Sequence, residues 1–132
     1  MEITYKAFNG NADIVAKLAK IEIKSFETKI KLLRVNKWFE AENEILKVLV
    51  TEIENKYKLK ETFDFNDEGN FVGENRDELV KVLEAKHIDE EALLAQTLQG
   101  SEYIFTAEDL EPLETSTEDL IKLESIGLFK LD

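Results

Sequence analysis

Residues 25–58 read SFETKIKLLRVNKWFEAENEILKVLVTEIENKYK, and this stretch decides the fold. Its apolar residues recur at i, i+3, i+4 and i+7, which is the spacing of one face of an α-helix. Ser25 is a favoured residue type for an N-cap. The sequence therefore predicts a long helix from Ser25 to near Lys58. One apolar arc of this helix is formed by Val35, Trp38, Phe39, Ile45, Leu46, Leu49, Val50, Ile53 and Tyr57.

The first half of this helix has a second apolar face, because Phe26, Ile30 and Leu33 fall nearly opposite the main arc. Two arrangements explain this pattern. Either the helix is central and covered from both sides, or it breaks within residues 36–43. We favour a break near Asn36 or between residues 40 and 43, because helices average about 11–12 residues. In an unbroken helix the Glu42 side chain points from the middle of the apolar arc. A carboxylate buried there would have a raised pKa and would be a candidate functional group. A break, or a place at the edge of the arc, is the simpler explanation for Glu42.

The rest of the chain alternates short helical and extended patterns around the long helix. Before it, residues 2–8 predict a strand and residues 12–20 a helix with Asn11 as its N-cap. After it, residues 62–72 predict a β-hairpin whose turn contains Gly69. Two helices are expected, over residues 76–86 behind Asn75 and over residues 90–98 behind Asp89.

The C-terminal third predicts a strand over residues 102–105 and a capping box of Thr106 with Asp109. A last helix begins behind Ser116 or Thr117 and ends at Gly127. The fold class is therefore α+β and mostly helical, with one long central helix, a small β element and short C-terminal helices. A length of 132 residues fits a single domain spanning 1–132.

The charge is strongly acidic and unevenly distributed. The chain has 17 Lys and Arg against 29 Asp and Glu, a net charge of −12, which disfavours nucleic acid and anionic membranes as partners. Residues 1–60 hold 12 basic and 9 acidic residues, whereas residues 61–132 hold 5 basic and 20 acidic. This split either holds the two halves together or aligns neighbouring copies head to tail, although two solvated faces explain it most simply. We expect a protein partner with a basic surface, or other copies of the chain.

Residues with catalytic potential are few. The chain has no cysteine and one histidine, and it lacks a glycine-rich phosphate loop and a glycine-framed nucleophilic serine. We therefore expect no enzyme activity and no cofactor.

Two short motifs resemble parts of metal sites. Asp64, Asn66 and Glu68 precede Gly69 as in a calcium loop, but its twelfth position holds Asn75 instead of glutamate. Glu84-Ala-Lys-His87 has the Glu-x-x-His spacing of di-iron bundles, which need that motif twice. A β-turn and a surface histidine are the simpler explanations, so we predict no metal site.

Candidate contact residues for a protein partner are of two kinds. Trp38-Phe39 and the tail formed by Leu128, Phe129 and Leu131 could anchor an interface, although core packing is the simpler explanation for both. Acidic clusters could meet a basic partner, although acids at helix starts also stabilise the helix dipole. These clusters comprise Asp89, Glu90, Glu91, Glu108, Asp109 and Glu111.

The order of elements resembles an uncharacterised family of small proteins from phages of Gram-positive bacteria. The residues that carry the resemblance are the short lysine-rich first segment MEITYK, the apolar-basic link over residues 18–26 and the end of the long helix over residues 54–57. The polar turn at residues 66–69 and the Thr/Ser-rich cap at residues 114–119 also match. Residues 25–28 differ, because the family has small residues and an arginine there. The resemblance implies phage origin and residence in the bacterial host cytoplasm or the virion, and it supplies no catalytic residues.

Three functions follow as hypotheses. The leading one is a non-enzymatic phage accessory protein that acts through protein–protein interaction, in virion assembly or on a host factor. The alternative is an acidic inhibitor that imitates phosphate charge toward a nucleic-acid-binding defence or host enzyme, which requires carboxylates on one continuous face. The second alternative is a small metal-binding protein.

Overall fold

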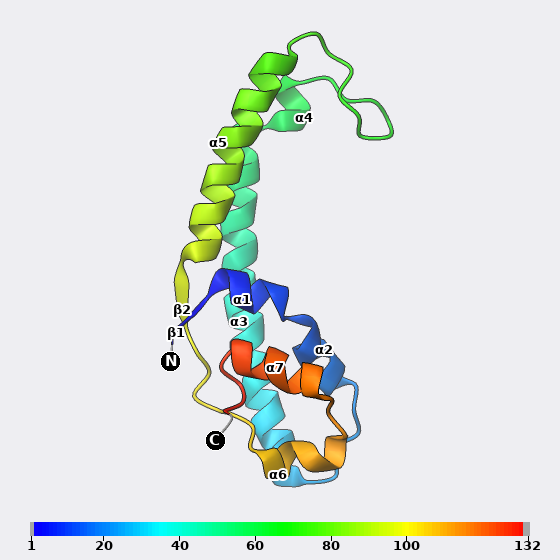
Figure 1. Ribbon diagram of the computed structural model, residues 1–132, viewed down its shortest axis with the longest axis vertical. Coiled ribbons are helices and arrows are strands. Elements are labelled where there is room, and N and C mark those ends of the chain that lie inside the picture. The colour runs from blue at the N-terminus through cyan, green and yellow to red at the C-terminus, as the bar shows by residue number, and fades with distance from the viewer. Residues whose placement is uncertain (1, 131–132) are drawn as a thin grey trace.

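The long helix α3 forms the spine of the molecule (Figure 1). The structure is a computed structural model that describes residues 2–130. Its elements are β1 (Glu2–Thr4), α1 (Tyr5–Gly10), α2 (Asp13–Ala19), α3 (Phe26–Tyr57), α4 (Leu59–Thr62), α5 (Arg76–Ala95), β2 (Thr97–Gln99), α6 (Ala107–Leu110), the 3-10 helix η1 (Glu111–Leu113) and α7 (Thr117–Ser125). The predicted class, α+β with one long helix and short C-terminal helices, is confirmed.

The molecule has two parts, which we call the arm and the body. In the arm, α5 lies alongside the C-terminal half of α3, and the tip carries α4 and the loop of residues 63–75 (Figure 1). In the body, α1, α2, α6 and α7 gather near the N-terminal half of α3. The arm and the body therefore share one helix, and each occupies a different end of it.

Helix α3 is continuous, so the predicted break within residues 36–43 is wrong. Val35 and Leu46 are both buried, one on each side of the predicted break. Between them, the Tyr5 hydroxyl donates to Glu42 Oε2 over 3.1 Å. Contacts with the rest of the chain therefore hold this region helical, although 32 residues greatly exceed an average helix.

The ends of α3 have distinct local causes. Ser25 caps the helix as predicted, because its Oγ accepts a hydrogen bond from the Thr28 N–H over 3.4 Å. At the other end, Lys58 adopts the left-handed conformation, with φ 46° and ψ 48°. This backbone turn ends α3 and sends the chain into α4.

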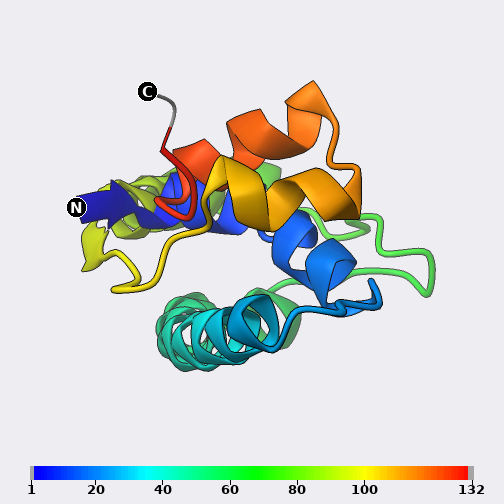
Figure 2. The ribbon, with the colours of Figure 1, turned by 90° about the horizontal axis from the view of Figure 1, so that it is seen from below.

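Within residues 2–130, the other elements cover one side of α3 and leave the other side bare. Figure 2, which looks along α3, shows the other helices on one side of it. Phe26, Ile30 and Leu33 lie on the bare side, with 78%, 51% and 63% of their surface exposed. The alternative of a central helix covered from both sides is therefore also wrong.

The β element is small, as predicted, but it lies elsewhere. Strands β1 and β2 pair antiparallel, with Ile3 opposite Leu98. The strand expected over residues 2–8 ends at Thr4, because the Thr4 Oγ1 accepts from the Ala7 N–H over 3.1 Å and caps α1. The hairpin expected over residues 62–72 and the strand expected over residues 102–105 are reduced to isolated bridges, Phe65 with Phe71 and Phe105 with Phe129.

Helix α5 runs unbroken from Arg76 to Ala95, so the two helices predicted there are one. Asp89, the expected N-cap of the second, does not cap a helix. Its carboxylate accepts hydrogen bonds from Lys56 and Tyr57 of α3, over 2.8 and 2.5 Å. A side chain of the capping type is used here to join two helices.

The core lies in the body. Capping boxes position its last helices: Thr106 with Asp109 begins α6, as predicted, and Ser116, one of the two expected caps, begins α7 together with Asp119. Asn11, the predicted N-cap of the helix over residues 12–20, instead lies directly after α1. Its side-chain amide donates to the Ala7 carbonyl over 2.8 Å. The largest fully buried side chains are Phe8, Ile14, Leu18, Val35, Phe105, Leu110, Leu123, Ile126 and Leu128.

Part of the uneven charge is neutralised by ion pairs between the two halves of the chain. Within residues 2–130, five ion pairs join the first 60 residues to the rest of the chain, with N–O distances of 2.6 to 2.8 Å. Pairs with an exposed partner typically contribute about 0.2–1 kcal/mol each, whereas the Lys31 and Asp109 side chains are both mostly buried. The pairs are Lys17–Asp119, Lys31–Asp109, Lys56–Asp89, Lys86–Glu54 and Lys122–Asp13.

Candidate interaction surfaces

Trp38 and Phe39 support the core instead of standing free on the surface. The Phe8 ring lies between them, with its centroid 5.6 Å from Trp38 in an edge-to-face contact and 5.0 Å from Phe39 in a stacked one. The indole N–H of Trp38 donates to the Gln99 carbonyl over 3.0 Å and so ties α3 to β2. Both side chains are half-buried. Their packing accounts for their presence on α3.

The apolar tail also belongs to the core. Leu128 is fully buried and Phe129 is buried, so neither side chain offers surface to a partner. The Phe105 N–H donates to the Leu128 carbonyl over 2.7 Å, which fixes the tail beside residue 105. Leu131, the third predicted anchor, lies outside the described residues.

The acidic cluster of α5 is only partly available. The Lys56 ammonium and the Tyr57 hydroxyl beside Asp89 lower the pKa of its carboxyl. Glu91 Oε1 lies 3.0 Å from the His87 Nε2 on the next turn of the helix. Glu90 is exposed. The side chain of Asp89 is therefore used to join helices, whereas Glu90 and Glu91 remain on the surface.

The second acidic cluster, in α6 and η1, is also only partly available to a partner. Asp109 accepts hydrogen bonds from the Thr28 hydroxyl over 3.1 Å, from Lys31 over 2.6 Å and from the Thr106 N–H over 2.8 Å. Burial opposes ionisation of Asp109, but these hydrogen bonds outweigh it and lower the pKa. Glu108 and Glu111 are exposed near the end of the body.

The exposed carboxylates are spread along the molecule. They lie on the arm at Glu90 and Glu91 and near the far end of the body at Glu108 and Glu111, and the tip loop carries others at Asp64 and Asp67 (Figure 1). Phosphate mimicry requires them on one continuous face.

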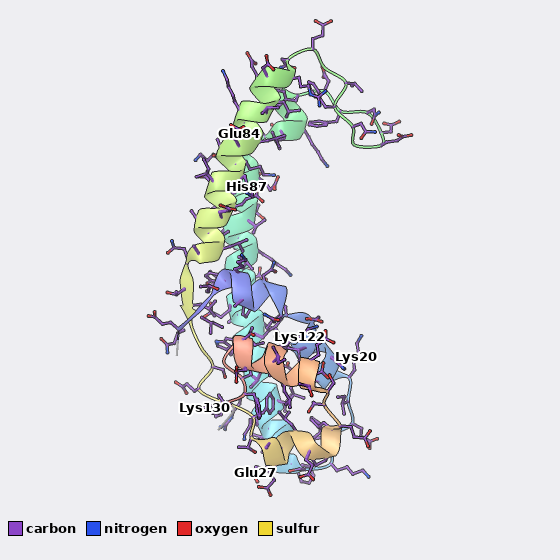
Figure 3. All side chains as sticks on the ribbon, in the orientation of Figure 1. Lys20, Glu27, Glu84, His87, Lys122 and Lys130 are labelled. Carbon is purple, nitrogen blue, oxygen red and sulfur yellow. The ribbon has the colours of Figure 1, made fainter. Side chains whose placement is uncertain are left out.

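The two motifs that resemble metal sites have other partners. The Asn66 Oδ1 accepts from the Glu68 and Asn70 N–H groups over 3.0 and 2.9 Å, so its side chain shapes the turn before Gly69. His87 lies on the exposed surface of α5 and pairs with Glu91 (Figure 3). Within residues 2–130, no three His, Cys, Asp or Glu side chains are grouped as metal ligands would be.

Glu42, the carboxylate expected at the apolar arc, is half-buried and meets the Tyr5 hydroxyl. Burial of the Tyr5 phenol raises its pKa, and the hydrogen bond to Glu42 and the charge of Glu42 raise it further. This contact ties the start of α1 to the middle of α3, which is a structural use for both side chains.

The strongest candidate surface is the uncovered face of α3. We call Phe26, Ile30 and Leu33 the α3 stripe; all three are exposed at i, i+4 and i+7 spacing. Cations border it: the Lys29 ammonium lies 5.7 Å from the Phe26 ring centroid. The Arg34 guanidinium stacks 4.9 Å from the Tyr103 ring centroid. The sequence pattern reveals this second apolar face, but only the structure shows that nothing within residues 2–130 covers it.

A second exposed stripe, made of two apolar residues and a histidine, lies on the arm. We call Val80, Leu83 and His87 of α5 the α5 stripe; Val80 and Leu83 are 45% and 43% exposed, and the His87 side chain is 70% exposed. Three exposed acids, Asp77, Glu84 and Glu91, recur every seventh residue beside it. The two stripes therefore combine apolar side chains with opposite charge.

Comparison of the chain with protein-family models, with curated proteins and with solved structures found no match. Among the described residues, no helix is both long enough and apolar enough to cross a membrane.

Proposed function

We propose that this protein is a non-enzymatic interaction protein that binds another protein through the α3 stripe. The observation that carries the proposal is the exposure of Phe26, Ile30 and Leu33 on the side of α3 that the other helices leave bare. Large apolar side chains that gather on one exposed helix face are typical of a protein-binding surface, because their burial against a partner is favourable.

The chemistry around the stripe indicates what it prefers to bind. Residues 24–37 contain five Lys and Arg against one Glu. Such a surface fits an amphipathic helix with an acidic border, a common mode of helix recognition. The sequence suggests a partner with a basic surface, on the basis of the acidic half; the α3 stripe favours an acidic one.

The biological setting that we propose is a bacteriophage. It is based on the resemblance of the element order to small phage proteins, which implies residence in the host cytoplasm or the virion. In that setting the partner is a virion protein or a host factor.

A stripe-dependent capture experiment tests the proposal. Tagged wild-type protein and Leu33→Asp are expressed in the bacterial host during infection, and the bound proteins are identified by mass spectrometry. Leu33 is 63% exposed, so the substitution should leave the fold intact while it places a charge in the apolar face. We expect wild type to retain a specific protein that Leu33→Asp loses.

The matched control is Ile121→Asp, which makes the same kind of change at another exposed apolar residue, on α7. It should retain the same protein as wild type. Loss of the protein by both variants, or retention by both, would contradict a role for the α3 stripe.

A further inference from the structure

We propose that the α3 stripe of one copy of this protein binds the α5 stripe of a second copy, so that copies associate head to tail. This inference rests on the proposed function, because it names the partner of the same α3 surface. It is carried by the geometry of the two stripes, by their charge and by their positions in the molecule.

The two stripes have matching helical geometry. In the α3 stripe the steps between side chains are four and three residues, from 26 to 30 and from 30 to 33. In the α5 stripe, read from its C-terminal end, they are also four and three residues, from 87 to 83 and from 83 to 80. Each stripe thus spans two turns of one helix face, and two such faces can pack as a helix–helix seam.

The charges beside the stripes are complementary. Residues 24–37, which comprise the first part of α3 and the two residues before it, carry five basic residues and one acidic residue. Residues 76–91 of α5 carry six acidic and three basic residues. Opposite charges that border an apolar contact select its partner and speed encounter. Two α3 stripes, or two α5 stripes, would instead bring like charges together.

The stripes cannot meet within one molecule. Helix α5 packs on the other end of α3, where Lys86 reaches Glu54 and Asp89 reaches Lys56. From Leu33 to Glu54 a helix rises by about 30 Å, at about 1.5 Å per residue. Figure 3 shows the same separation, with Glu27 at the foot of α3 and Glu84 and His87 on the arm. Each copy therefore has one free surface of each kind.

Such a contact joins two different surfaces, so every copy added leaves one of each exposed. An interface of this type builds a ring if its rotation closes and an open chain if it does not. A seam of two helical turns is small beside the roughly 1,200 Å² of a stable interface. We therefore expect association at high micromolar concentration, weakened by salt.

The experiment measures mass in solution by sedimentation velocity, from about 10 μM to about 1 mM protein. Leu33→Asp disables the α3 stripe and Leu83→Asp disables the α5 stripe, and circular dichroism confirms that both variants remain folded. We expect wild type to form species larger than dimers, and each variant alone to stay monomeric. An equimolar mixture of the two variants retains one intact pair of stripes, so it should form dimers and nothing larger.

The outcomes separate this inference from the proposed function. Ile121→Asp, the control, should associate like wild type. A wild type that stays monomeric at every concentration overturns the head-to-tail contact, whereas the capture experiment can still show another partner at the α3 stripe. Association by Leu83→Asp alone also overturns it, because the α3 stripe would then bind something other than the α5 stripe. Failure of both experiments would remove the proposed function too.

Discussion

A single carboxylate, that of Asp109, connects the start of α6 to α3. It completes the capping box with Thr106 and also accepts hydrogen bonds from Thr28 and Lys31. Its pKa is lowered, so the folded state favours the charged form. A group with a lowered pKa stabilises the fold above its unfolded pKa of about 3.9, and that stabilisation is lost as the pH falls through the folded pKa.

We predict that Asp109→Asn lowers the free energy of unfolding by about 1–2 kcal/mol at pH 7. The amide keeps the shape of the side chain and can still accept from the Thr106 N–H, but it loses the charge that faces Lys31. The difference between variant and wild type should shrink at pH 3, because below about pH 3.9 the unfolded wild type takes up a proton that the folded state, with its lowered pKa, resists. Chemical denaturation at the two pH values measures both quantities.

Glu108→Gln provides the control, because Glu108 is the exposed neighbour of Asp109. It should leave the free energy of unfolding unchanged within about 0.5 kcal/mol. An effect of Asp109→Asn that is equally large at pH 7 and pH 3 would show that the charge of Asp109 is not what stabilises the fold.

At the scale of residues, the sequence identified local partners better than distant ones. The capping role of Asp109 follows from its spacing to Thr106, three residues away. Its contacts with Thr28 and Lys31 bridge 81 and 78 residues, and no local pattern encodes them. The same holds for the α3 stripe: its periodicity is visible in the sequence, but its exposure depends on where the rest of the chain packs.

Helix α3 ends at a residue whose conformation does not suit its side chain. Lys58 has φ 46°, in the left-handed region that costs residues other than glycine about 1–2 kcal/mol. Glycine adopts this conformation without that cost and is the common residue at such helix ends.

We therefore predict that Lys58→Gly raises the free energy of unfolding by about 0.5–1 kcal/mol. Lys60→Gly is the matched control, because the same change inside α4 removes no left-handed side chain and costs helix propensity. Thermal and chemical denaturation should order the proteins as Lys58→Gly, wild type and Lys60→Gly, from most to least stable. Equal destabilisation by both glycines would argue against strain at residue 58.

At the scale of elements, the sequence predicted where helices begin more reliably than where they continue. The starts at Phe26 and Arg76 were predicted from Ser25 and Asn75. The predicted interruptions were wrong for a shared physical reason. Asp89, a residue type that favours a helix start, instead binds Lys56 and Tyr57 of α3, and Glu42 at the expected break of α3 binds Tyr5. Contacts with other elements therefore keep both helices continuous.

The whole molecule is unequally packed along its length. The largest fully buried side chains lie in the body, where eight of the nine come from segments outside α3 and α5, such as Phe8 and Leu123. In the arm, burial relies on fewer residues, chiefly Leu46, Phe63, Leu79 and Leu93. Sequence reasoning predicted a mostly helical domain but not this division, because it depends on which half of α3 each distant segment covers.

This division has a consequence for backbone amide exchange with heavy water. Exchange from well-packed regions requires global unfolding, whereas sparsely packed regions open locally at lower cost. We predict that α3 amides between residues 30 and 39 exchange at least about tenfold more slowly than those between residues 50 and 57, a difference of about 1.4 kcal/mol in opening free energy. Nuclear magnetic resonance or mass spectrometry measures both, and uniform exchange along α3 would contradict the division.

One uninterrupted helix would then have two different stabilities, high at the foot and low toward the tip. The arm could unfold and refold locally while the body stays folded. The arm would then be a separate cooperative unit, although it shares the backbone of α3 with the body. A partner that clamps the arm would slow exchange there and leave the body unchanged, so the exchange profile of α3 would also report where a partner binds.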